Sequence, residues 1–226
     1  MTTSLLPITL LGAVLGLDTV SFPQAMFSRP LVAATLGGAL AGAPLGGLMV
    51  GAALELIALE TLPFGASRYP EWGSASVVGG ALYAASPLPL AGKMTISLLA
   101  AVATAWVGGW TMVKLRQRNA RWSERSRSGL DAGARGTVIG LQLRGMTADL
   151  IRGALLTVVA IAVFAPLAEA SLGLWSVDAR LSRGLAVGVA ASVAGAAAWK
   201  LFHGSIAARW TFVGGLAVGL ATLVLR

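Results

Sequence analysis

Hydrophobic residues occur in long runs that polar segments separate. These runs cover residues 5–17, 31–62, 75–91, 94–113, 153–174, 184–199 and 210–225. A helix needs about 20 mainly apolar residues to cross the hydrocarbon core of a bilayer. The pattern therefore predicts an all-α polytopic membrane protein with about six or seven apolar helical segments.

The run over residues 31–62 is too long for one crossing. As a single helix it would extend about 48 Å, whereas the hydrocarbon core is about 30 Å thick. Pro44 follows Gly42 and Ala43, and proline removes a backbone donor and clashes with the preceding turn. We therefore expect a broken or re-entrant pair of helices near residues 31–62. Transporters place substrates at such breaks, because irregular backbone survives in a membrane only where protein or a cavity surrounds it.

Glycines recur in the same run at helical spacing. Gly38, Gly42 and Gly46 follow one another at intervals of four, as do Gly47 and Gly51. Small residues at this spacing let the backbone of another helix approach closely. The sequence therefore predicts tight packing around the break.

Charge divides the chain into two halves. The net charge is +8, and residues 114–152 carry nine basic and three acidic side chains. A basic stretch between apolar runs follows from the positive-inside rule, so no nucleic acid partner is expected. We predict a basic cytoplasmic loop at 114–136 between a site-bearing half (1–113) and a second helical half (137–226), all within one membrane domain.

Composition restricts the chemistry further. Hydrophobic residues make up 56% of the chain and charged residues 12%, and cysteine is absent, which excludes disulfide scaffolds and thiol chemistry. His203 is the one histidine, so a metal site built from several imidazoles is also excluded. We expect no cofactor, no metal and no catalytic residue.

Three acidic residues lie in or near apolar surroundings: Asp18, Glu55 and Glu60. A charge at the bilayer centre costs about 2.5 to 3.5 kcal/mol on insertion scales, so each should face a cavity or a partner. Together with Gln24 they suit sugar hydroxyls, which donate and accept hydrogen bonds. The alternative is an ion pair that only fixes packing, either Asp18 with Arg29 or Glu55 with Arg68.

The spacing of these residues resembles a known signature. Gly38-xxx-Gly42, Gly47-xxx-Gly51 and Leu54-Glu55 are similar to the membrane-spanning IIC subunit of the mannose/fructose/sorbose family of the bacterial sugar phosphotransferase system. The segment from Asp18 through Gln24 to Arg29-Pro30-Leu31 also resembles that family. Two positions depart from it: Ala43 stands where the family usually has Asp, Asn or His, and Glu60 where glycine is common.

The resemblance implies a non-catalytic permease subunit of the bacterial inner membrane. Such a subunit pairs with a IID membrane subunit, binds a hexose near the bilayer midplane and passes it to the soluble phosphocarrier proteins IIA and IIB, of which IIB carries a phosphohistidine. A homo-oligomer is compatible with this arrangement.

On this interpretation Asp18, Gln24, Glu55 and Glu60 bind the sugar. The supporting residues neutralise a carboxylate, shape the broken helix or form a connection beside the site. They are Arg29, Pro30, Gly42, Pro44, Gly47, Gly51, Gly65 and Ser67.

Two alternatives remain open. Ala43 allows a scaffold or sensor that resembles the permease but has lost transport. Asp131 and Asp149 superficially resemble the metal-binding motif of CDP-alcohol phosphotransferases, which would make the chain an intramembrane lipid enzyme. In that motif Ala132 interrupts the expected Asp-Gly pair and Gly153 replaces the last aspartate, so two carboxylates are too few for the two-metal site.

Overall fold

A computed structural model describes residues 5–59, 68–174, 178–202 and 206–224, and all regular structure in those ranges is helical. The helices are α1 (Leu5–Asp18), α2 (Pro30–Leu40), α3 (Pro44–Ala58), α4 (Trp72–Ala85), α5 (Leu90–Arg125), α6 (Arg127–Asp131), α7 (Arg135–Ala170), the 3-10 turn η1 (Leu172–Leu174), α8 (Ala179–Phe202) and α9 (Ile206–Val224). Each predicted apolar run contains a helix. The all-α fold class is confirmed.

The run over 31–62 is broken at the predicted point. α2 ends at Leu40, and α3 begins at Pro44, which takes the first position of the helix and so loses no hydrogen bond there. Between them Gly42 has φ +91°, a left-handed conformation that glycine adopts without a steric penalty. The two helices are about 16 and 22 Å long, so neither reaches across a hydrocarbon core of about 30 Å.

Glycines bring the backbones of α2, α3 and α4 into direct contact. A Cβ atom on Gly47 of α3 would lie 2.3 Å from the carbonyl oxygen of Ala34, and one on Gly80 of α4 would lie 2.0 Å from the same oxygen. A Cβ on Gly38 would approach Gly47 Cα to 2.8 Å. The tight packing predicted from the glycine spacing is confirmed here.

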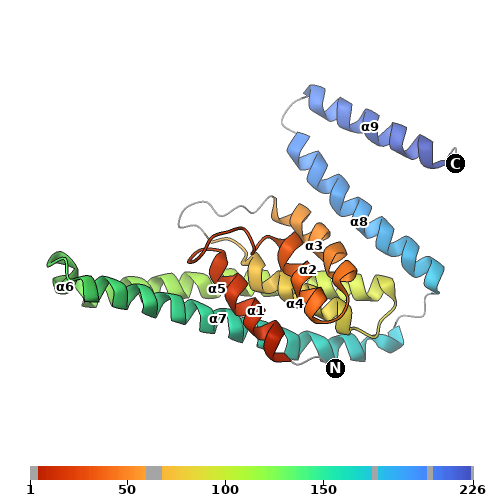
Figure 1. The fold of residues 1–226 in the computed structure, drawn as a ribbon. Helices are drawn as coiled ribbons and strands as arrows, with labels where there is room; N and C mark the ends of the chain where they lie inside the picture. The colour runs from red at the N-terminus through yellow and green to blue at the C-terminus, as the bar shows by residue number, and fades with distance from the viewer. Residues whose placement is uncertain (1–4, 60–67, 175–177, 203–205, 225–226) are drawn as a thin grey trace.

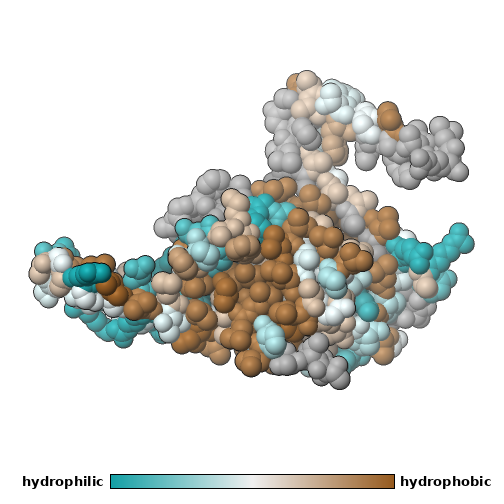
Figure 2. Space-filling model, viewed as in Figure 1, coloured by the Kyte–Doolittle hydropathy of each residue, from teal (hydrophilic) through white to brown (hydrophobic). Residues whose placement is uncertain are grey.

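The basic segment 114–136 is helical, which corrects the predicted loop. α5 continues through its basic residues to Arg125, the short α6 makes the turn, and α7 begins at Arg135 (Figure 1). No glycine or proline interrupts residues 111–126, so the charges mark where the chain becomes polar rather than where the helix ends. Figure 2 shows hydrophilic residues gathered at the α6 end of this hairpin.

Two helices of the described chain, α5 and α7, are long and apolar enough to cross a membrane, whereas α1, α2 and α3 are shorter apolar helices. Both long helices have 36 residues and extend about 54 Å, well beyond one hydrocarbon core. The excess length explains how each helix can cross the membrane and still carry a polar extension.

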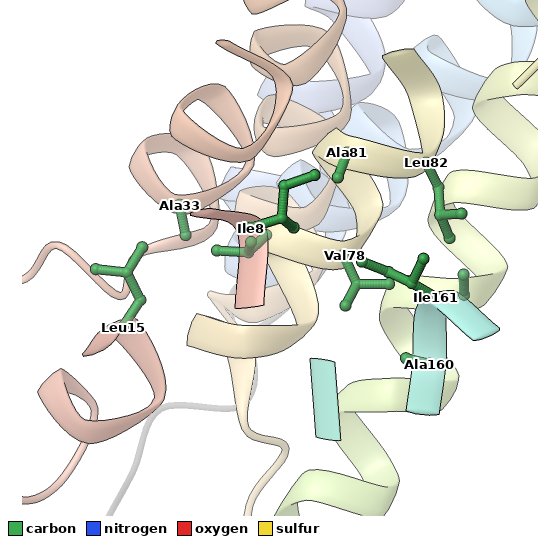
Figure 3. Packing of buried hydrophobic residues seen from close by; sticks show 10 residues of the cluster. Ile8, Leu15, Ala33, Val78, Ala81, Leu82, Ala160 and Ile161 are labelled. Atoms are coloured by element: carbon green, nitrogen blue, oxygen red, sulfur yellow. The ribbon is translucent and has the colours of Figure 1, made fainter. Parts of the chain in front are cut away.

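Small and branched apolar side chains from five helices, α1, α2, α4, α5 and α7, form the core shown in Figure 3. Ile8 of α1, Ala33 of α2, Val78 of α4 and Ile161 of α7 are all almost fully buried in it. α8 joins the body where Ser182 Oγ accepts a hydrogen bond from the backbone N–H of Ala91, at 2.8 Å. Of the predicted sugar ligands, Asp18 ends α1, Gln24 lies between α1 and α2, and Glu55 belongs to α3.

Candidate functional site

The segment between α1 and α2 is folded around the carboxylate of Asp18. The Asp18 side chain is almost fully buried at the end of α1, and its two oxygens accept hydrogen bonds from the backbone N–H groups of Ala25 and Ser28, both at 2.8 Å. Within this segment, Gln24 and Met26 have positive φ angles of 58° and 65°. Left-handed non-glycine residues persist only where surrounding contacts hold them. Asp18 therefore fixes the course of residues 19–29.

A second carboxylate holds the far end of this segment. Glu55 of α3 forms an ion pair with Arg29, and its other oxygen accepts the backbone N–H of Leu31 at 3.1 Å. This places a negative charge at the N-terminus of α2, where the helix dipole favours it. Neither ion pair considered from the sequence forms: Arg29 pairs with Glu55 rather than Asp18, and Arg68 lies over the ring of Trp106.

Among the predicted ligands that the structure describes, Gln24 is the most accessible. Its side chain is exposed, and its amide nitrogen donates to the carbonyl of Val20 at 3.0 Å. A primary amide carries two N–H donors and an acceptor oxygen, which matches a sugar hydroxyl. The structure thus brings Asp18, Gln24 and Glu55 together at residues 18–31, which we call the site segment, although Asp18 and Glu55 are 37 positions apart in the sequence.

The supporting residues shape this arrangement through the backbone. Pro30 takes the first position of α2, and a Cβ on Gly51 would lie 2.8 Å from its carbonyl oxygen. Gly51 therefore lets α3 approach the start of α2, which is where Glu55 makes its contacts. The predicted residues Glu60, Gly65 and Ser67, like His203, lie outside the described residues.

Sequence reasoning missed a buried charge cluster on the other side of the segment. Arg152 Nε donates to Asp149 Oδ1 at 2.8 Å, and Arg152 Nη1 lies 3.9 Å from Glu71 Oε2. Thr19 and Ser21, both in the site segment, donate hydrogen bonds to the carboxylates of Glu71 and Asp149 at 3.4 and 2.7 Å. The signal was present in the sequence, because an aspartate and an arginine three residues apart in an apolar helix must face inward and pair.

Asp149 is therefore occupied by ionic and hydroxyl partners within the protein. Asp131 lies elsewhere, in α6, where its carboxylate is 3.9 Å from Arg127. In the described part of the chain, no group of three or more His, Cys, Asp or Glu is placed to hold a metal ion. The two aspartates that suggested a lipid phosphotransferase thus have separate partners.

A cavity lined by both apolar and uncharged polar residues opens beside the site segment, between α5 and α7. Its volume is about 480 Å³, and Ser21 is the one member of the segment in its lining. The other lining residues are Asn119, Ala120, Trp122, Ser123, Leu141, Gln142, Gly145 and Met146. Uncharged hydrogen-bonding groups beside an indole ring suit a small polar ligand rather than an ion.

Comparison with known proteins identifies the family to which this geometry corresponds. The family model described as the PTS system sorbose-specific IIC component matches residues 2–198. No curated protein gave a significant match.

Two solved structures share the fold. One, described as "Structure of membrane protein", superposes with a TM-score of 0.67 at 18% sequence identity, covering 100% of this chain and 94% of that chain. The other, described as "CryoEM Structure of Mannose Transporter ManYZ and Microcin E492 (MceA) complex", has a TM-score of 0.62 at 19% identity, covering 97% of this chain and 87% of that chain.

Proposed function

Since the chain belongs to the sorbose-specific IIC family of phosphotransferase-system components, it is a membrane sugar transporter subunit, and we propose that it binds a hexose with Asp18, Gln24 and Glu55. One observation carries this proposal. Asp18 and Glu55 both accept hydrogen bonds from backbone N–H groups of the same irregular segment, beside a helix pair that is broken inside an apolar run. Irregular backbone with polar groups at such a break is where transporters bind their substrates.

The proposed cycle divides the chemistry between subunits. This chain and a IID membrane subunit hold the sugar within the bacterial inner membrane, and the soluble IIA and IIB proteins supply the phosphoryl group. The cavity between α5 and α7 supports delivery of the sugar toward the basic hairpin, because Ser21 belongs both to the lining of the cavity and to the site segment. The chain itself takes no part in phosphoryl transfer.

Replacing the Glu55 carboxylate tests the site. Glu55→Gln keeps the shape of the side chain but removes the charge that binds Arg29 and the Leu31 N–H. A hydrogen bond to a charged group contributes about 1.5 to 3 kcal/mol, so we expect the KM for sugar to rise about tenfold or more. Uptake of radiolabelled sorbose and mannose into vesicles containing the complete transporter measures this.

Glu169→Gln is the matched control, because Glu169 is an exposed glutamate of α7 away from the segment. We expect its KM to match that of the unmodified protein, and both variants to insert into the membrane normally. Unchanged uptake by Glu55→Gln would remove Glu55 from the site.

A transport-impaired scaffold is the second candidate, and one observation bears on it. Ala43 occupies the N-cap position of α3 and makes no side-chain capping hydrogen bond. A residue there acts first on the stability of the helix. The alanine at position 43 therefore weakens the start of α3 and does not by itself remove a ligand of the sugar, which favours the transporter over the scaffold.

A further inference from the structure

The beginning of the site segment is attached to charges that lie outside α1, α2 and α3. Ser21 Oγ donates to Asp149 of α7 at 2.7 Å, and Thr19 Oγ1 donates to Glu71, just before α4, at 3.4 Å. Both carboxylate side chains are only 1% exposed. The Ser21 bond at 2.7 Å has the length of a strong charge-assisted hydrogen bond, whereas the Thr19 contact at 3.4 Å is weak. The segment is thus held at its start by the charge cluster and at its end by Glu55.

Arg152 is the cation of the cluster, and its side chain is 9% exposed. It donates to Asp149 at 2.8 Å, approaches Glu71 to 3.9 Å and donates to Thr111 of α5 at 3.5 Å. Glu71 also accepts the backbone N–H of Ser74 at 3.0 Å as the N-cap of α4, where the partial positive charge of the helix start offsets the second carboxylate. Glu71 Oε2 and Arg152 Nη2 are buried without a hydrogen-bond partner in the described part of the chain, so the cluster is held by ion pairing as well as by hydrogen bonds.

Glycines from three helices make room for this cluster. A Cβ on Gly108 of α5 would lie 2.8 Å from Glu71 Cβ, and one on Gly73 of α4 would lie 3.0 Å from Glu71 Oε1. A Cβ on Gly16 of α1 would lie 2.5 Å from Ser74 Oγ and 3.6 Å from Arg152 Nη2. The charges therefore sit at a close-packed junction of α1, α4, α5 and α7, which is a rigid support.

We infer that Asp149 and Arg152 are positioning residues for the sugar site and that they act through Ser21. Arg152 Nε binds Oδ1 of Asp149, whereas the buried Oδ2 accepts its hydrogen bond from Ser21, so the charge cluster and the segment are joined at this one carboxylate. The Ser21 contact sets where the segment leaves α1, and hence where Gln24 is presented. This inference rests on the proposed function, because it concerns a sugar bound at that segment.

Kinetics separate positioning from simple stabilisation. Ser21→Ala removes the hydroxyl alone, and Asp149→Asn leaves one guanidinium facing one carboxylate, so the buried charges remain balanced. We expect each variant to raise the KM for sorbose or mannose about five- to tenfold, with the maximal uptake rate nearly unchanged. Asp149→Asn should also lower the thermal unfolding midpoint, because it weakens the buried ion pair with Arg152. Ser21→Thr, which keeps the hydroxyl, should restore the KM.

Two further variants complete the design. The double variant combines Ser21→Ala with Asp149→Asn. Its KM should match that of Asp149→Asn alone, because both changes break the same Ser21–Asp149 contact. Thr157→Ala is the control: Thr157 is a buried hydroxyl of α7 that contacts α1 and donates to the Gly153 carbonyl, away from the segment. It should lower the unfolding midpoint without changing the KM.

Hydrogen exchange tests the positioning without relying on sugar transport. The N–H groups of Ser21, Ala25 and Ser28 are hydrogen-bonded, so a peptide covering residues 19–29 reports on the order of the segment. In the full chain in lipid nanodiscs, Ser21→Ala and Asp149→Asn should speed exchange in that peptide about tenfold and leave residues 76–82 of α4 unchanged.

The outcomes distinguish the two proposals. Faster exchange in a protein that takes up neither sorbose nor mannose would support the positioning and count against the proposed function. Sugar uptake with unchanged KM and unchanged exchange in both variants would overturn the positioning and leave the proposed function intact. Fully additive effects on KM in the double variant would also overturn it.

Discussion

Ala43 shows how one residue separates two interpretations of the same break. It precedes Pro44, its backbone N–H donates to the Gly38 carbonyl at 2.8 Å, and its carbonyl accepts from Gly47 at 3.0 Å. Its φ and ψ angles of −135° and 69° lie outside the helical region, as those of an N-cap residue do. Both backbone hydrogen-bonding groups of Ala43 therefore have partners, and the position lacks only a side chain that could cap α3.

Restoring that cap gives a prediction at the residue scale. Ala43→Asn supplies a side-chain oxygen to the free N–H groups of the first turn without adding charge, so we expect about 0.5 to 2 kcal/mol of stabilisation. For a chain of this size that raises the thermal unfolding midpoint by a few degrees, about 2 to 4 °C per kcal/mol, measurable in detergent. The KM for sugar should stay constant. A variant that gained transport which the unmodified protein lacks would instead favour the impaired-scaffold interpretation.

At the scale of elements, α2, α3 and α4 pack through their backbones rather than through large side chains. The Ala34 carbonyl lies where a Cβ on Gly47 or on Gly80 would stand, and Val77 of α4 approaches Gly37 of α2 as closely. Backbone groups cannot move aside as the end of a flexible side chain can. Any added methyl group must therefore separate the helices, and with them the two ends of the site segment.

Gly47→Ala tests this packing. The new Cβ would lie 2.3 Å from the Ala34 oxygen, so we expect a loss of about 1 to 3 kcal/mol in stability, with reduced sugar uptake because Glu55 moves with α3. Gly140→Ala is the matched control, since Gly140 is a helical glycine of α7 with open space around it. It should stabilise the protein by up to about 1 kcal/mol. Equal effects of the two substitutions on the unfolding midpoint would refute the packing argument.

The helices also show which features of the fold the sequence predicts and which it does not. The break before Pro44 is predictable because proline and glycine act on the local backbone. The helical course of residues 114–125 was missed because basic residues report the surroundings of a helix and not its end. The partner of Arg29 depends on how α3 lies against α2, and the link from Ser21 to Asp149 spans 128 positions. Such contacts follow from tertiary packing, which no local pattern encodes.

At the scale of the whole molecule, α5 and α7 form a long hairpin with a hydrophilic tip at one end and an apolar body at the other (Figures 1 and 2). Seven basic residues lie on the hairpin between positions 114 and 135: Lys114, Arg116, Arg118, Arg121, Arg125, Arg127 and Arg135. Positive charge next to a membrane crossing favours the cytoplasmic side. The fold therefore orients the body: the start of α5 and the end of α7 should lie toward the opposite side.

The absence of cysteine from the chain makes this orientation directly measurable. Ser128→Cys places one thiol on the exposed α6 turn, and Ser171→Cys places one at the end of α7, the opposite end of the hairpin. In intact cells, a membrane-impermeant maleimide should label the cysteine at position 171 and label the one at 128 only after permeabilisation. The two variants control for each other, since each should label fully in detergent. The reverse pattern would place the basic hairpin outside the cell and make it unable to meet the soluble phosphocarrier proteins, so the proposed hand-off of sugar on that side would fail.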